Sequence, residues 1–298
     1  MLVIAGNLRL GAQGTRRAYL GSTLVFAAEQ TRWGTDFSEY STGVAPSDWT
    51  SIASSHLETW EITSGGLISD NRMRIRQAKA DSPIHFSHFL WDAVPEVGDS
   101  EFLLLISRGT SATANHQVGA VQRFTGTTFS SHQGVFLGAR NNVEDVTFRR
   151  VTNGFQHDWV AARHGGTFDA GAALWVRGRW EGTNYRVKGW IADTGKEDLG
   201  LSDEPSSWQI NNTYGTVTGV GRIGVAHGVF SSTPAQSETF VHYFGVGIDG
   251  DSAPLPVFVP DRAPAPIPGP APEPGTFETF DSTATSFDST AHTFDEVA

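Results

Sequence analysis

The chain has 298 residues, of which 39% are hydrophobic and 18% charged, and its net charge at pH 7 is −11. These totals are ordinary for a folded protein and exclude a wholly disordered one. The acidic balance, with no basic cluster to offset it, argues against a nucleic-acid partner. Cysteine is absent, so disulfides and thiolate metal sites are excluded.

The N-terminal residues 1–32 contain two short β-like runs. Residues 8–10 and 18–26 are rich in aliphatic side chains, and Gly11 and Gly14 predict a turn that joins the runs into a hairpin. A unit of this size buries too little surface to fold alone, so we expect it to dock on something larger. The N-terminus lacks the basic start and apolar core of a signal peptide, and no stretch approaches the roughly 18 apolar residues of a membrane span. No membrane partner is expected.

Residues 33–252 alternate short β-branched or aromatic runs with clusters of turn-forming residues. No amphipathic helical pattern interrupts them. The clearest predicted strands cover residues 73–76, 101–106, 119–124, 173–180, 185–191, 222–226 and 239–246. Many short strands with frequent turns predict an all-β domain, built as an antiparallel β-sandwich of the jelly-roll kind.

The composition changes after residue 252. Residues 253–275 are rich in proline, which favours an extended polyproline spacer and predicts a linker. Together with the segment that follows, this linker is expected to form an extended C-terminal tail.

The last segment, residues 276–298, repeats a Phe-Asp box every seven residues. The repeated residues are Phe280, Asp281, Phe287, Asp288, Phe294 and Asp295. We interpret the segment as an extended peptide that anchors the chain to a partner or to neighbouring subunits, because exposed phenylalanines are unusual in inert tails. An inert, disordered tail is the alternative.

The most informative stretch is a predicted hairpin over residues 174–191 that turns at residues 181–184, followed by a loop to Trp208. Strand alternation places apolar side chains on one face and a mixture of aromatic and basic side chains on the other. Sugars bind to aromatic faces beside planar polar groups. The candidate carbohydrate-binding residues are Trp175, Arg177, Arg179, Arg186, Trp190 and Trp208. The alternative for each tryptophan is a place in the core, which is the commoner one.

This hairpin carries a resemblance to a known family. The pattern Trp175-Val-Arg177, Arg179, Gly182, Arg186-Val-Lys188-Gly-Trp190 and Glu204-Pro205…Trp208 resembles the central hairpin of concanavalin A-like (laminin-G-like) jelly rolls of tailed-phage proteins and related particles. Residues 36–49 and 243–250 are similar to the first and last strands of that fold. The likeness covers roughly residues 34–252 and implies the fold, which hosts lectins, glycosidases and purely structural modules.

A second resemblance concerns the termini. Residues 19–26, preceded by residues 8–11, look like a segment common in phage minor tail and receptor-binding proteins, and the repeated Phe-Asp-Ser-Thr boxes also look phage-like. Together the resemblances imply a virion protein of a tailed phage or gene transfer agent, of the tail-fibre or head-spike type. Its partners would be other virion subunits, held through the termini, and host cell-surface polysaccharide.

The same resemblance implies a location and an assembly state. The chain would be made in the host cytoplasm without a signal peptide, released by lysis and carried on the virion surface, where a homo-oligomer repeats the module for avidity. A structural or decoration protein of capsid or tail is the second reading.

A polysaccharide-degrading glycosidase is the third reading. Glucanases of this fold alternate carboxylates along one strand, which places them on one face around the glycosidic bond. The nearest string here runs from Glu96 through Asp99 to Glu101, and Glu96 would point away from the other two. No Gly-x-Ser-x-Gly elbow occurs. We therefore expect a non-enzymatic protein.

Metal binding has little support in the sequence, and no cofactor is expected. Asp249 and Asp251 could contribute to a calcium site, as in some laminin-G-like domains, although a turn is the commoner meaning of Asp-Gly-Asp. His85 and His88 lie three residues apart, but zinc would need a third ligand nearby.

Overall fold

The computed structural model describes residues 17–20, 23–27, 30–78, 85–109, 116–140, 144–153, 155–164, 168–169, 171–229 and 237–258. The chain divides into two compact units, Met1–Ala265 and Pro266–Ala298. The predicted anchoring peptide, residues 276–298, and most of the predicted linker lie outside the described residues.

A short antiparallel hairpin lies near the N-terminus. Strand β1 (Arg17–Leu20) pairs with β2 (Thr23–Ala27), and Leu20 lies opposite Thr23. Both strands therefore come from the second of the two predicted runs. The predicted pairing with residues 8–10 involves residues outside the described part of the chain.

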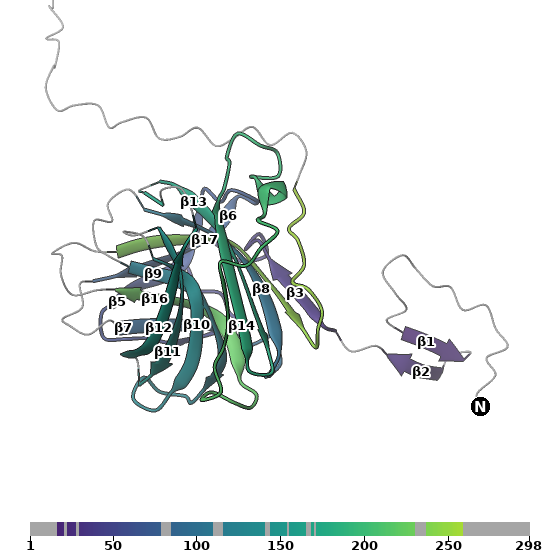
Figure 1. Ribbon diagram of the computed structural model, residues 1–298. Coiled ribbons are helices and arrows are strands. Elements are labelled where there is room, and N and C mark those ends of the chain that lie inside the picture. Colours follow the sequence, from purple (N-terminus) through teal and green to yellow (C-terminus); the bar gives the residue numbers. More distant parts are fainter. Residues whose placement is uncertain are drawn as a thin grey trace, which may run out of the picture. The chain divides into compact units, whose positions relative to one another are not determined.

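The main domain is an all-β sandwich of two antiparallel sheets, which confirms the predicted fold class (Figure 1). The smaller sheet has the order β12 (Phe155–Arg163), β11 (Asp145–Thr152), β10 (Gln133–Arg140), β9 (His116–Thr125), β16 (Arg222–Val229), β7 (His85–Trp91) and β4 (Trp49–Ile52). The larger sheet has the order β15 (Ile210–Thr213), β14 (Asn184–Ile191), β13 (Ala173–Glu181), β8 (Ser100–Arg108), β17 (Ser237–Ile248), β6 (Asn71–Gln77) and β5 (Leu57–Ser64).

Two further elements complete the domain. Strand β3 (Arg32–Thr35) pairs with β17 beyond the part of β17 that β6 occupies. A single 3-10 turn, η1 (Leu201–Asp203), lies in the loop after β14. In the part of the chain that the structure describes, no helix is long and apolar enough to cross a membrane.

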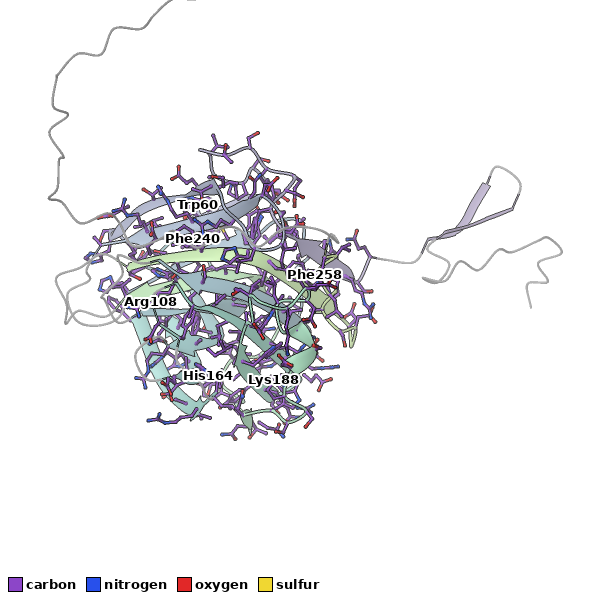
Figure 2. All side chains as sticks on the ribbon, turned by 90° about the horizontal axis from the view of Figure 1, so that it is seen from above. Trp60, Arg108, His164, Lys188, Phe240 and Phe258 are labelled. Atoms are coloured by element: carbon purple, nitrogen blue, oxygen red, sulfur yellow. The ribbon has the colours of Figure 1, made fainter. Side chains whose placement is uncertain are left out.

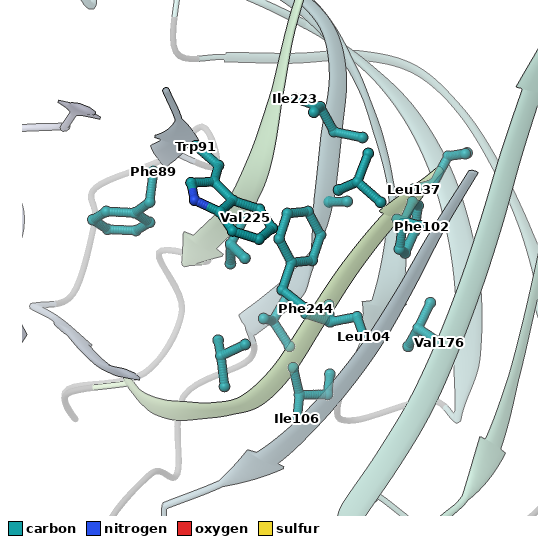
Figure 3. Packing of buried hydrophobic residues seen from close by; sticks show 14 of the residues in the cluster. Phe89, Trp91, Phe102, Leu104, Ile106, Leu137, Val176, Ile223, Val225 and Phe244 are labelled. Atoms are coloured by element: carbon teal, nitrogen blue, oxygen red, sulfur yellow. The ribbon is translucent and has the colours of Figure 1, made fainter. Parts of the chain in front are cut away.

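The main core lies between the two sheets and follows from the alternation of side chains along each strand (Figure 3). From the smaller sheet it takes Phe89, Trp91, Leu137, Ile223 and Val225, and from the larger sheet Phe102, Leu104, Ile106, Val176 and Phe244. In the predicted hairpin, which is β13 and β14, the apolar residues Leu174, Val176 and Val187 point into this core, as their spacing predicts.

The smaller sheet curls back on itself. Strand β12 pairs with β11 along its length and also meets β7, where Phe155 lies opposite His85. Small residues allow this curvature: a Cβ atom at Gly224 would lie 2.0 Å from the carbonyl oxygen of Phe89, and one at Gly119 would lie 2.2 Å from that of Leu137. Strand backbones thus approach more closely than any side chain would allow.

The face of the curled sheet that points away from the larger sheet holds a second core inside the curl, which we call the curl core. Its residues alternate with those of the main core and are all buried: Ile52, Phe86, Leu90, Val121, Phe124, Phe136, Val151 and Ala226. The curl core fills the concave side of the sheet. This face is therefore not an open, aromatic-lined groove.

A buried histidine lies against the curl core. His88 is fully buried, contacts the Phe124 ring at a tilt of 50° with the ring centres 4.8 Å apart, and meets the ring of His132 edge-on at 4.7 Å. Neither of its ring nitrogens has a hydrogen-bond partner among the described residues. Burial, and to a smaller extent the neighbouring His132, holds the pKa of His88 well below its ordinary value.

This burial predicts a loss of stability in mild acid. Below about pH 6.5 the unfolded chain takes up a proton on His88 that the folded chain refuses, so the free energy of unfolding falls as the pH drops. We expect about 1 kcal/mol of that loss between pH 7.5 and 5.5 to disappear in His88→Phe, which keeps the ring contacts. Urea unfolding at both pH values measures it. An unchanged pH dependence in the variant would contradict the role given to His88.

Candidate carbohydrate-binding surface

The outer face of the larger sheet is partly covered by the chain itself. The loop after β14 and an extended strap, residues 251–258, pack on this face, where Tyr243 donates its hydroxyl hydrogen to Pro254 O at 2.7 Å. Beneath them lies a third cluster, the covered core, made of Ile68, Leu103, Leu105, Ala173, Trp175, Trp190, Ala192, Leu199, Tyr243 and Ala253. Phe258 packs against the same cluster.

Two of the predicted sugar-binding tryptophans belong to this covered core. Trp175 and Trp190 stack at 6.2 Å with their planes 19° apart, and they are 0% and 5% exposed. Trp175 donates its indole hydrogen to Leu199 O at 2.9 Å and Trp190 to Gly200 O at 3.0 Å. Neither ring has a free face for a sugar in this structure, because the loop lies over both. They occupy the core position that the sequence left as the alternative.

The next row of side chains forms a largely buried ion network. Arg177 Nη1 lies 2.5 Å from Glu101 Oε1 and Arg177 Nε lies 2.7 Å from Glu204 Oε1. Lys188 Nζ is 2.8 Å from the same oxygen of Glu204 and donates to Pro205 O at 2.7 Å. Arg177 thus ties the loop to the sheet. It was predicted to touch a ligand, and the structure gives it internal carboxylate partners.

Arg179 extends this network towards the hairpin turn. It lies 3.3 Å from Glu101 Oε2, 2.7 Å from Glu181 Oε1 and donates to Gly250 O at 3.3 Å. Its side chain is 22% exposed, whereas that of Glu101 is 4% exposed. Arg179 therefore lies at the boundary between the buried network and the open part of the face.

Beyond that boundary the face is open. The register places Arg179, Arg186 and Asn211 opposite one another on β13, β14 and β15. Trp208 is half-buried, and Lys188 Nζ, on the next outward-facing residue after Arg186 in β14, lies 4.8 Å from the centre of its ring. We call Arg179, Arg186, Asn211 and Trp208 the open strip. Figure 2 shows Lys188 well apart from Phe240, which belongs to the other half of the same sheet.

The open strip has the chemistry of a saccharide site. Its one tryptophan lies against Lys188, and the row that begins with the next outward-facing residue, Arg186, supplies two guanidinium groups and an amide. An aromatic ring gives an apolar face to a sugar, and planar polar groups bind its hydroxyls. Of the six predicted residues, Arg179 and Arg186 lie opposite each other on this accessible part of the sheet, and Trp208 lies against Lys188, one row away.

Sequence reasoning missed Asn211 as part of the strip. Asn211 adjoins Arg186 only because β15 pairs with β14, and β15 was not predicted as a strand. The run Ile210-Asn-Asn-Thr213 has a single apolar residue and no alternation, so the sequence carries no clear signal for this short edge strand.

Two of the three carboxylates considered for glycosidase chemistry, Asp99 and Glu101, have structural roles. Asp99 Oδ1 accepts hydrogen bonds from Arg123 at 3.1 Å and from the backbone of Gly182 at 2.8 Å, and Glu101 is enclosed in the ion network. The crevice between Asp99, Glu101 and Arg179 has a volume of about 10 Å³. That is room for about one water molecule and not for a sugar.

A serine and a histidine lie in contact on the same face, but in the wrong arrangement for a nucleophile. Leu67 donates its backbone hydrogen to His242 Nδ1 at 3.0 Å, so the ring proton sits on Nε2 and is donated to Ser107 Oγ at 2.7 Å. His242 in this tautomer cannot take the proton of Ser107, as a general base would have to.

The residues considered for metal binding are dispersed or paired elsewhere. Asp251 binds Thr31 Oγ1 and lies 3.6 Å from Arg32, while Asp249 has a φ of 55° in the turn after β17. His85 contacts Phe155, and His88 lies at the curl core. Within the described ranges, no three histidine, aspartate or glutamate side chains are grouped to hold an ion. Calcium binding stays a prediction, and the described residues show no site for it.

Comparison with known proteins assigns the chain to no family, but it finds solved structures that are similar to it. No protein-family model and no curated protein matches the sequence. A family 16 endo-glucanase from Bacteroides ovatus is similar at 6% identity over 72% of this chain and 99% of its own, with a TM-score of 0.48. A carbohydrate-binding module, CBM66 from Bacillus subtilis, is similar at 11% identity over 67% and 95%, with a TM-score of 0.43.

Lectin II from Ulex europaeus is similar at 7% identity over 72% of this chain and 97% of its own, also with a TM-score of 0.43. The three neighbours share at most 11% identity with this chain, and each has a TM-score below 0.5. At such identities and TM-scores, they carry no argument about what this chain binds. The virion origin implied by the sequence resemblance stays a prediction.

Proposed function

We propose that the chain is a non-enzymatic component of a tailed-phage or gene-transfer-agent particle, of the fibre, spike or tail-associated type, and that its sandwich binds host cell-surface polysaccharide on the open strip. The observation that supports this most is the part of the face left open by the loop and strap, where Arg179, Arg186 and Asn211 form one row and the half-buried Trp208 lies against Lys188, the next outward-facing residue on β14. The virion setting comes from the resemblance of the hairpin and the two termini.

The location of the strip suits a weak, repeated contact. An open strip touches one side of a saccharide and leaves the rest in water, so a single module binds weakly. Copies of the module on one particle would raise the overall avidity without new contacts. In this proposal the terminal segments hold the chain to other virion subunits, and the sandwich faces the cell.

A purely structural or decoration protein is the second candidate. The observation in its favour is the extent of self-coverage: the curl core fills one outer face, and the loop and strap cover much of the other. A protein that only has to be stable on a particle needs no open groove.

Retention of the whole chain on polysaccharide purified from candidate host cells separates these functions. We expect the chain to be retained and the polysaccharide to keep its length by size-exclusion chromatography, because the carboxylates needed to cleave it are internally paired. Shortened chains would establish a glycosidase instead. No retention on any host polysaccharide would favour the structural candidate.

A further inference from the structure

Within the open strip, one carboxylate bridges two arginines. Glu181, at the end of β13, places Oε1 2.7 Å from Arg179 Nη2 and Oε2 3.5 Å from Arg186 Nη2. Its side chain is 37% exposed, and that of Arg186 is 33% exposed. The two arginines come from adjacent strands and lie directly opposite each other. They form a fork of two guanidinium groups that meets a single, accessible acid.

Arg186 has donors to spare. Glu181 is its one ion-pair partner among the described residues, and its Nε atom is buried without a hydrogen-bond partner there. A guanidinium carries five hydrogens in a fixed planar arrangement that suits a carboxylate. A single contact at 3.5 Å uses little of that capacity, so Arg186 can bind a second acidic group or a better-placed one.

The local charge favours an anion although the whole chain does not. Around the fork, the basic side chains of Arg177, Arg179, Arg186 and Lys188 face the carboxylates of Glu101, Glu181 and Glu204. These seven side chains carry one net positive charge, in a chain whose net charge is −11. Asp99 and Asp251 line the same crevice as Arg179 and Glu181, and each has an arginine partner of its own, Arg123 and Arg32. Attraction to an acidic ligand would be short-ranged and confined to this strip.

We propose that the open strip binds an anionic polysaccharide, with a sugar carboxylate taking the place of Glu181 between Arg179 and Arg186. This inference rests on the proposed function and names its ligand class. Trp208 would hold the ring of the sugar, and Asn211 would bind a hydroxyl or the same carboxylate. Because one accessible carboxylate replaces another, the exchange adds little desolvation, and Glu181 acts as an internal competitor.

Polygalacturonate and its methyl-esterified form test the proposal, since they share a backbone and differ in charge. By affinity electrophoresis of the whole chain at fixed ionic strength, we expect the acidic form to bind about tenfold more tightly. Glu181→Gln should strengthen binding of the acidic form about three- to tenfold and leave the neutral form unchanged. Arg186→Gln should weaken binding of the acidic form about tenfold.

Arg163→Gln is the matched control, because Arg163 is exposed on the smaller sheet and lies 3.6 Å from Glu144. It should change neither affinity. Equal affinity for both polymers, or a Glu181→Gln variant that weakens the acidic form, would overturn the anionic proposal and leave polysaccharide binding in place. Binding of neither polymer would also overturn it, while retention on host polysaccharide decides the proposed function separately.

Discussion

Replacing Glu101 by glutamine is expected to lower the free energy of unfolding by about 3 kcal/mol. Glu101 is 4% exposed and lies between Arg177 and Arg179, and it also accepts the backbone hydrogen of Ala253 at 3.2 Å. Removing its charge leaves Arg177, which is 9% exposed, with Glu204 as its remaining ion-pair partner among the described residues, and Arg179 with Glu181. Denaturant unfolding of the whole chain measures the loss.

Glu144→Gln is the control for this variant. Glu144 also pairs with an arginine, but Arg163 is 76% exposed, and exposed pairs contribute less than about 1 kcal/mol. If Glu101→Gln lost no more stability than Glu144→Gln, this would contradict the role of the ion network in holding the loop and the strap on the larger sheet.

A methyl group at Gly224 is expected to cost about 3 kcal/mol or more, because it would have to displace the backbone of β7. The added Cβ would lie 2.0 Å from Phe89 O and 2.6 Å from Leu90 Cα. These contacts involve backbone atoms, which cannot rotate away as a side-chain end can. The curl of the smaller sheet should open, or the chain should fail to fold.

Gly215→Ala provides the comparison. A Cβ at Gly215 meets nothing within 4 Å, so the free energy of unfolding of this variant should lie within about 1 kcal/mol of that of the original chain. Phe136→Ala keeps the test informative if Gly224→Ala does not fold, because emptying the curl core should cost about 3–5 kcal/mol. Equal stability of all three variants would mean that the outer face of the smaller sheet is not a packed core.

The sandwich could be predicted from the sequence because each strand has a side-chain alternation that is visible within a few consecutive residues. Period-two alternation along β13 and β14 assigned each side chain to the correct face, and Leu174, Val176 and Val187 are in the main core. Strand boundaries do not follow from the sequence in the same way, since pairing and not the side-chain pattern decides where a strand ends. The predicted strand 101–106, for example, extends over Ser100–Arg108 in the sheet.

What covers each face could not be predicted. Alternation places Trp175 and Trp190 on the outer face, but the segments that bury them, around Leu199 and Ala253, are held there by tertiary contacts. The curl of the smaller sheet likewise depends on one pairing between Phe155 and His85, which are distant in sequence. A face that looks open in the sequence can thus be closed by residues whose position depends on the whole fold.

The most direct test of the central claim is the affinity of Trp208→Ala for the polysaccharide that retains the chain, measured beside Phe258→Ala. Both residues are half-buried aromatics on the outer face of the larger sheet, but Phe258 packs on the covered core. We expect at least about tenfold weaker binding for Trp208→Ala and an unchanged affinity for Phe258→Ala. Unchanged binding by Trp208→Ala, with both variants folded, would contradict the central claim and place the saccharide elsewhere on the molecule.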